Sequence, residues 1–385
     1  MHISHSVLYY LADELKTGVL QMGIFRVLSQ IVIMAAVISA AGCRCAENLF
    51  CADEAKITRF FSWAAPQNEI QAQKFAQAGV TDIIVGNRKQ HELAKKYGMN
   101  PYWKCFYPAG PHRQVISPEE EKLYDYLRGR DLDKNLSRAE RKKILEKRKV
   151  EKQYRYGGEK VTDIGILAYD LPCFISDEGL LLSGKKIDDI LKDAPADSAG
   201  IFLDFIGYMN HKGCYCSACL DKLKTFLAAE KLPDTPENRN RFYRDALVKY
   251  YNDVIAYIKN KRPDFKIAVH IYPDFESEHL CGNRIKADFC GQTVAWYFKW
   301  DEEKIKQYTA VTVKKAKDHH AFAEGVPFLG LSSDKNSPLG YKTPEDVERE
   351  LKAIINAGGT SLMVCFGLPI IEEGYFEVFK KFCGR

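Results

Sequence analysis

Short apolar runs and amphipathic stretches alternate along most of this chain. Eight apolar runs, bounded by glycine or polar residues, are typical of buried strands. They lie at residues 57–63, 81–86, 100–107, 200–208, 265–272, 293–298, 328–333 and 361–366. Helical patterns lie between them, and Thr343-Pro344 opens one with a capping residue followed by proline at the first helical position. Eight strands alternating with helices predict a (β/α)8 barrel, an α/β fold.

An open doubly wound sheet is the alternative architecture. It is less consistent with the sequence, because no glycine-rich phosphate-binding loop follows any early strand. The alternation breaks at residues 108–162, which we interpret as a charged insertion after the third strand. Residues 138–156 have helical propensity and are dense in Lys, Arg and Glu. This insertion is either a solvated helical excursion or a lid, because the loops that follow barrel strands form the mouth.

Composition places the chain among globular proteins and narrows its partners. Of 385 residues, 46% are hydrophobic and 28% are charged, as in ordinary folded domains. The net charge is +5, and residues 111–160 alone hold 15 Lys and Arg against 10 Asp and Glu. The imbalance is therefore confined to one segment, and no broad basic face is predicted. We expect no nucleic-acid partner.

The first 46 residues have the pattern of an export signal. Arg26 precedes the apolar run 27–38, and the small residues Ser-Ala-Ala-Gly stand before Cys43. They are similar to a bacterial lipobox, so we expect lipidation at Cys43, with plain cleavage as the alternative. The run is shorter than the ~20 residues of a membrane-spanning helix. Met1 or Met22 is the start. Residues 1–46 are predicted as leader and linker, and 47–385 as the barrel of an exported periplasmic or cell-surface lipoprotein.

The fourth predicted strand carries the first candidate for catalysis. Asp204 is the only charged residue in the run Gly200 to Tyr208, near the carboxyl end where barrel enzymes place their active sites. Glycoside cleavage usually requires a second carboxyl group across the scissile bond. The candidates follow later strands: Asp301, Asp334, and Asp274 or Glu276. Each also fits a plainer role, namely a helix cap, a turn or a solvated loop.

Aromatic and polar side chains at the ends of the predicted strands are candidates for sugar binding. Aromatic rings offer apolar platforms, and polar groups fix orientation. The candidates are Trp63, Asn87, Arg88, Lys104, Tyr107, Tyr208, His270, Tyr272 and Trp296. Some of the aromatic residues belong to the core, and His270, inside an apolar strand, also fits a hydrogen-bonded core histidine.

Three of the 12 cysteines follow the fourth strand directly, as Cys214, Cys216 and Cys219 in the spacing C-x-C-x-x-C. Thiolates suit a tetrahedral zinc ion, and this loop supplies three. Cys173 is our candidate for the fourth ligand, and Cys105 is the next. Disulfides are the alternative in an exported protein. We expect a structural zinc ion and no organic cofactor.

The segment from Cys173 to about Leu227 resembles family 42 glycoside hydrolases and the broader group of glycosidase-like barrels with a C-Y-C-x-x-C segment. This resemblance implies a zinc site at Cys173, Cys214, Cys216 and Cys219. Where that family has Asn-Glu at the end of strand four, with Glu as the acid/base, this chain has Asp204-Phe205, so the acid/base is not carried over. Asp204 is also similar to the nucleophile position of α-galactosidase-type barrels.

The sequence therefore predicts a glycoside hydrolase that acts on carbohydrate through a carboxylate pair including Asp204. The alternative is a non-catalytic carbohydrate-binding barrel that keeps the fold and the zinc site. A metal-dependent hydrolase fits less well, because no His-x-His follows the first strand and His319-His320 precede the seventh.

Overall fold

The chain divides into two compact units, Met1–Ala55 and Lys56–Arg385. The computed structural model describes residues 56–105, 129, 131–151, 154–156, 159–161, 173, 175, 177–206, 214–271, 284–297, 299–319, 324–335, 337, 340–365 and 367–384. The predicted leader and the lipidation site at Cys43 lie outside these residues. In the described part of the chain, no helix has both the length and the apolar character needed to cross a membrane.

Eight parallel strands form a closed barrel in the order β1-β2-β3-β6-β7-β8-β9-β10, with β10 returning to β1. They are β1 (Arg59–Ser62), β2 (Asp82–Val85), β3 (Asn100–Cys105), β6 (Gly200–Ile206), β7 (Lys266–Ile271), β8 (Phe289–Ala295), β9 (Glu324–Gly330) and β10 (Ser361–Cys365). The register shows that the barrel is closed, since Ser62 of the first strand pairs with both Val364 of the last strand and Ile83 of the second. The predicted barrel is confirmed, and the open doubly wound sheet is excluded.

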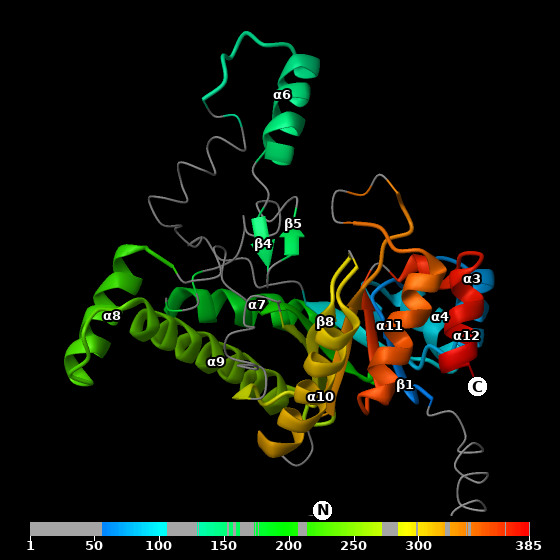
Figure 1. Cartoon of the computed structure of the whole chain (residues 1–385). Coiled ribbons are helices and arrows are strands. Elements are labelled where there is room, and N and C mark those ends of the chain that lie inside the picture. Colours follow the sequence, from blue (N-terminus) through cyan, green and yellow to red (C-terminus); the bar gives the residue numbers. More distant parts are fainter. Residues whose placement is uncertain are drawn as a thin grey trace, which may run out of the picture. The chain divides into compact units, whose positions relative to one another are not determined.

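Helices connect the strands and pack outside the barrel. They are α3 (Glu69–Gln77), α4 (Arg88–Lys96), α7 (Asp177–Asp193), α8 (Ser217–Ala229), α9 (Pro236–Lys261), α10 (Glu302–His319), α11 (Pro344–Asn356) and α12 (Tyr375–Cys383). Figure 1 shows α10, α11 and α12 following one another along one flank of the strands. Helix α11 begins as predicted, with Thr343 as its cap in a reciprocal capping box with Asp346.

Several predicted boundaries are wrong, and three of them show why. Strand β8 begins at Phe289, four residues before the expected start, because Gly291 and Gln292 interrupt the apolar run although all seven residues are buried. Strand β9 begins at Glu324 rather than 328. The helix expected over 138–156 ends at Glu151, as α6 (Arg138–Glu151). Residues Tyr154–Tyr156 instead form β4, which pairs with β5 (Glu159–Val161).

Side chains from non-adjacent strands meet inside the barrel. The rings of Phe61 on β1 and Tyr102 on β3 both lie against Phe289 on β8, at centroid distances of 5.2 and 6.2 Å. A Cβ atom on Gly291 would lie 3.0 Å from the sulfur of Met363 and 2.7 Å from the Val269 carbonyl oxygen. Glycine is therefore required there for Met363 to fill the interior, which is a packed core and not a pore.

A buried ion pair fixes the segment between β9 and α11. Lys342 Nζ lies 2.7 Å from Glu350 Oε2, and both side chains are fully buried. The same ammonium donates to the carbonyl oxygen of Gly330 at the end of β9, at 3.0 Å. Burial lowers the pKa of Lys342 and raises that of Glu350, each opposed by the partner's charge. The pair thus ties the end of a barrel strand to the helix that follows it.

Candidate functional site

Asp204, His270 and Thr293 form a hydrogen-bonded chain across three neighbouring barrel strands. His270 Nδ1 lies 3.3 Å from Asp204 Oδ1, and His270 Nε2 lies 3.2 Å from Thr293 Oγ1. Parallel pairing of Leu203 with Val269 makes Asp204 and His270 lateral neighbours on β6 and β7. Both ring nitrogens of His270 thus have a hydrogen-bonding partner, and the tautomer of the ring sets which atom donates in each bond.

Aromatic rings enclose these three hydrogen-bonded side chains. The imidazole of His270 stacks on Phe328 of β9 with a centroid distance of 3.8 Å and an interplanar angle of 17°. Trp63, directly after β1, meets the same imidazole edge-on at 5.4 Å. The exposed fractions of Asp204, His270 and Thr293 are 1%, 1% and 0%. The connectivity is that of an acid–base–hydroxyl triad, but Thr293 is too deeply enclosed to act as a nucleophile.

Lys104 adds a cation to the same end of the barrel. It lies near the end of β3, paired with Phe202 of β6, and is only partly buried. Its ammonium lies 5.9 Å from the centroid of the Trp63 ring. Burial lowers the pKa of Lys104, and the nearby charge of Asp204 opposes that change. The strand ends thus bring together Trp63, Lys104, Asp204 and His270, four of the residues predicted for the site.

The other described candidates for sugar binding have different surroundings. Trp296 is 4% exposed and its ring packs against Tyr297 and Phe328, so it belongs to the core beside the site. Asn87 caps α4 by accepting a hydrogen bond from the backbone N of Gln90 at 3.0 Å. Arg88 is exposed as the first residue of that helix. The predicted residues Tyr107, Tyr208, Tyr272, Asp274 and Glu276 lie outside the described residues.

The two described candidates for a second carboxylate occupy exposed positions. Asp301 Oδ1 accepts from the backbone N of Glu303 and of Lys304, at 3.0 and 3.2 Å, so it caps α10. Asp334 is exposed in a turn whose backbone closes when Ser337 N donates to its carbonyl oxygen at 3.0 Å. These are the plainer roles that the sequence already offered for both residues.

Sequence reasoning missed two partners of the site, Thr293 and Phe328. Both begin runs that were assigned as strands, and the register pairs them with each other. Alternation along the strands gives part of the signal, because residues two apart share a face, and the register between the strands gives the rest. Thr293 is two residues beyond Gly291, which itself pairs with His270. The hydroxyl and the imidazole therefore lie on the same inner face.

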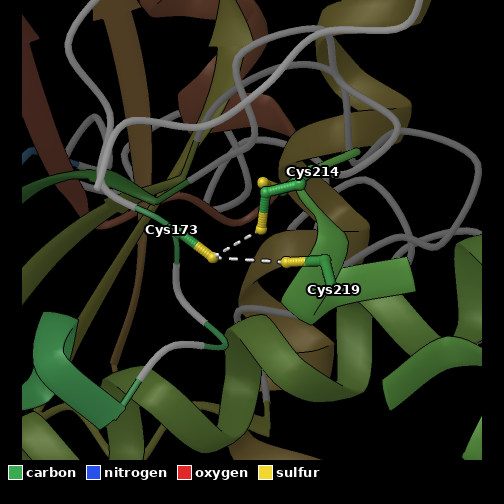
Figure 2. A group of neighbouring side chains, drawn as sticks. Cys173, Cys214 and Cys219 are labelled. Carbon is green, nitrogen blue, oxygen red and sulfur yellow. Dashed lines mark hydrogen bonds between the residues drawn. The ribbon is translucent and has the colours of Figure 1, made fainter. Parts of the chain in front are cut away.

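The four cysteines predicted as zinc ligands come together. Their sulfur atoms all lie within 4.8 Å of one another, and Figure 2 shows Cys173 reaching from a separate segment toward Cys214 and Cys219. Cys173 Sγ lies 3.2 Å from Cys219 Sγ and 3.8 Å from Cys216 Sγ. Both distances exceed the ~2.05 Å of a disulfide. Four sulfurs bound to one zinc ion at ~2.3 Å stand about 3.8 Å apart, so the donor set and its spacing fit this metal.

The surroundings of the cysteine cluster hold its segments in place. The Tyr243 hydroxyl on α9 donates to the carbonyl oxygen of Cys214 at 2.7 Å, and Lys222 Nζ on α8 donates to that of Ile175 at 2.8 Å. Cys173, Cys214 and Cys219 are buried, and Cys216 is partly exposed. The hydrogen bond with Cys173, together with burial, raises the pKa of the Cys214 thiol to about 12.

Comparisons with known proteins find similar solved structures but no related family or curated sequence. No family model matches the chain, and no curated protein matches its sequence. It is similar to solved structures of α-L-fucosidase isoenzyme 2 from Paenibacillus thiaminolyticus (12% identity, TM-score 0.48) and of a β-galactosidase from Rahnella sp. R3 (10%, 0.45). These alignments cover 85% and 82% of this chain, which spans about half of each of those proteins (48% and 51%).

A third similar structure is bee venom hyaluronidase, at 10% identity and a TM-score of 0.41, covering 83% of this chain and 95% of that one. At these identities and TM-scores the similarities carry no argument about this chain, and its barrel fold rests on the order of the eight strands.

Proposed function

We propose that this barrel is a glycoside hydrolase that binds carbohydrate at the carboxyl ends of its strands, with Asp204 as the central carboxylate. One observation supports this proposal most. The Asp204 carboxylate is hydrogen-bonded to His270 near the carboxyl end of β6, and Trp63 and Lys104 lie at the same site. A carboxylate oriented by a neighbour, near an aromatic ring and a cation, can hold a sugar hydroxyl or act on the anomeric centre.

The variant Asp204→Asn distinguishes carbohydrate hydrolysis from carbohydrate binding. It keeps the size and the hydrogen-bonding capacity of the side chain but removes its charge and basicity. For a hydrolase, release of reducing sugar from a polysaccharide panel falls at least about 100-fold, while binding of the same polysaccharide falls far less. Gln73→Glu, on the exposed side of α3, is a matched control that also interchanges an amide and a carboxylate. Unchanged turnover in Asp204→Asn would reject Asp204 as the central carboxylate.

The second candidate function is a non-catalytic carbohydrate-binding barrel. It is favoured by the 1% exposure of Asp204 and by the capping role of Asp301. In that case, the wild-type chain binds a polysaccharide in affinity electrophoresis but releases no reducing ends during prolonged incubation. Release that Asp204→Asn abolishes would contradict the binding barrel.

We also propose that Cys173, Cys214, Cys216 and Cys219 hold a structural zinc ion, as the resemblance to family 42 implies. The tetrahedral fit of their sulfur spacing supports this assignment, and four protein ligands leave no open position for catalysis. Metal analysis of the full-length protein, purified without added metal, should give one zinc ion per chain. A zinc content near zero in a folded sample would reject the site.

Export and lipid attachment remain proposals that rest on residues 1–46 alone. Mass spectrometry of the N-terminal peptide from an exporting bacterial host tests both, because a lipidated chain begins at Cys43 with an added diacylglyceryl group. An unprocessed start at Met1 or Met22 would reject them.

A further inference from the structure

Of the two charged side chains that meet beside Trp63, Lys104 and Asp204, the more accessible one is the cation. Lys104 is partly exposed, whereas Asp204 is 1% exposed and bound to His270. The two charges lie close enough to interact, but their exposures differ. A ligand that approaches from solvent can therefore reach the ammonium, while it reaches little of the carboxylate.

The aromatic side chains around Lys104 strengthen its attraction for an anion. Trp63 lies 5.9 Å from the ammonium, and the Trp63 ring packs on Phe202 and Phe328 at 5.3 and 5.7 Å. Low-dielectric walls focus the field of a charge and weaken its screening by water. Lys104 is only partly exposed, and burial lowers its pKa. An anionic oxygen beside it forms a charge-assisted hydrogen bond with the ammonium.

We propose that Lys104 forms, with the Trp63 ring, a subsite for an anionic sugar residue, one that bears a carboxylate or a sulfate group. The apolar face of the sugar packs on Trp63 and the anionic group accepts from Lys104 Nζ. This inference rests on the proposed carbohydrate function and specifies its substrate class. Asp204 keeps its place as the central carboxylate, and its charge disfavours an anionic group on its own side of the site. The anionic group is therefore directed toward Lys104.

The test compares each charged polysaccharide with its own neutral form. Affinity electrophoresis of the full-length chain is run against polygalacturonate and its methyl ester, alginate and its propylene glycol ester, and a carrageenan before and after desulfation. The first two pairs detect recognition of a carboxylate, and the third detects recognition of a sulfate. The wild-type chain should bind at least one charged form about tenfold or more tightly than its neutral counterpart.

Variants then assign that preference to one side chain. Lys104→Met should lose about tenfold to a hundredfold in affinity for the charged form and keep its affinity for the neutral form. Lys104→Arg, which keeps the charge, should retain most of the preference. Lys96→Met removes a surface lysine that pairs with Glu69 on α3 and should change neither affinity. Equal thermal midpoints confirm that the variants are folded.

The outcomes distinguish this inference from the proposed function. Equal binding of the charged and neutral forms overturns the anionic subsite and leaves the carbohydrate-binding barrel intact. A preference that Lys104→Met and Lys96→Met reduce alike also overturns it, because the attraction is then a general surface effect. Binding to none of the six polysaccharides overturns the subsite together with the proposed function.

Discussion

Replacing Lys342 with methionine should destabilise the barrel strongly. The ammonium is fully buried, 2.7 Å from Glu350 Oε2 and 3.0 Å from the Gly330 carbonyl oxygen. Methionine fills much of the same volume but can neither pair with the carboxylate nor donate to the carbonyl. Breaking a buried pair by removing one partner typically costs about 3–5 kcal/mol, because the remaining charge stays buried without compensation.

The lost free energy of unfolding should be measurable as a lower thermal midpoint. With an unfolding entropy of about 2.1 cal/mol/K per residue, a unit of roughly 330 residues loses about 4–7 °C in midpoint for 3–5 kcal/mol. Differential scanning calorimetry measures the shift. Burial already raises the pKa of Glu350, and loss of Lys342 raises it further. Protonation then relieves the buried charge, so the penalty of Lys342→Met should be larger at pH 8 than at pH 5.

Two variants control for packing and for surface charge. Lys381→Met removes an exposed partner of Glu348, at 3.0 Å, and should cost no more than about 1 kcal/mol. Lys342→Met combined with Glu350→Leu removes both charges and should recover most of the loss, as replacement of a whole buried pair often does. If Lys342→Met is no more destabilising than Lys381→Met, or if its penalty does not grow with pH, the reasoning is wrong.

Three further predictions address a helix cap, a pH dependence and the metal. Thr343→Ala removes the capping box of α11 and should lower the calorimetric stability by about 0.5–2 kcal/mol. Burial opposes ionisation of Asp288, but hydrogen bonds from Ile267 N, Lys266 and Lys259 hold its pKa below the ordinary value. Asp288→Asn should therefore cost about 1–3 kcal/mol at pH 7, and this cost should disappear as the pH falls through the lowered pKa of Asp288. Cys216→Ser should lower both the zinc content and the thermal midpoint, and Ser217→Ala should change neither.

The barrel could be predicted from the sequence because most of its strands are continuous apolar runs. Strands buried on both faces require such runs, and residues 200–206 and 361–365 provide two clear examples. Where a strand boundary was predicted wrongly, the sequence lacks such a continuous apolar run. Strand β9 contains Gly325 and Pro327, which are typical of turns and strand edges. Hydrogen-bonded pairing with β8 and β10, together with burial of its residues from Gly325 to Gly330, makes it a strand.

The site was predicted in part, since position along a strand can be inferred from the sequence and contact across strands cannot. Asp204 and Lys104 were selected by their place near strand ends. That Thr293 would bond His270 depends on the register between β7 and β8, and a shift of one residue would turn Thr293 to the outer face. The cysteine cluster was more predictable. Three of its members share one loop, so only the partner Cys173 required long-range information.

His270 shows why the distinction between a core residue and a site residue failed here. A histidine in an apolar strand was expected to be either a hydrogen-bonded core residue or a sugar ligand. The structure supports the first of these, with 1% exposure and hydrogen-bonding partners on both ring nitrogens. One of those partners is the carboxylate of Asp204, so the packing that buries the ring also orients the acid. Burial of His270 is therefore compatible with a positioning role in the site, because rigid support is what a reacting carboxylate requires.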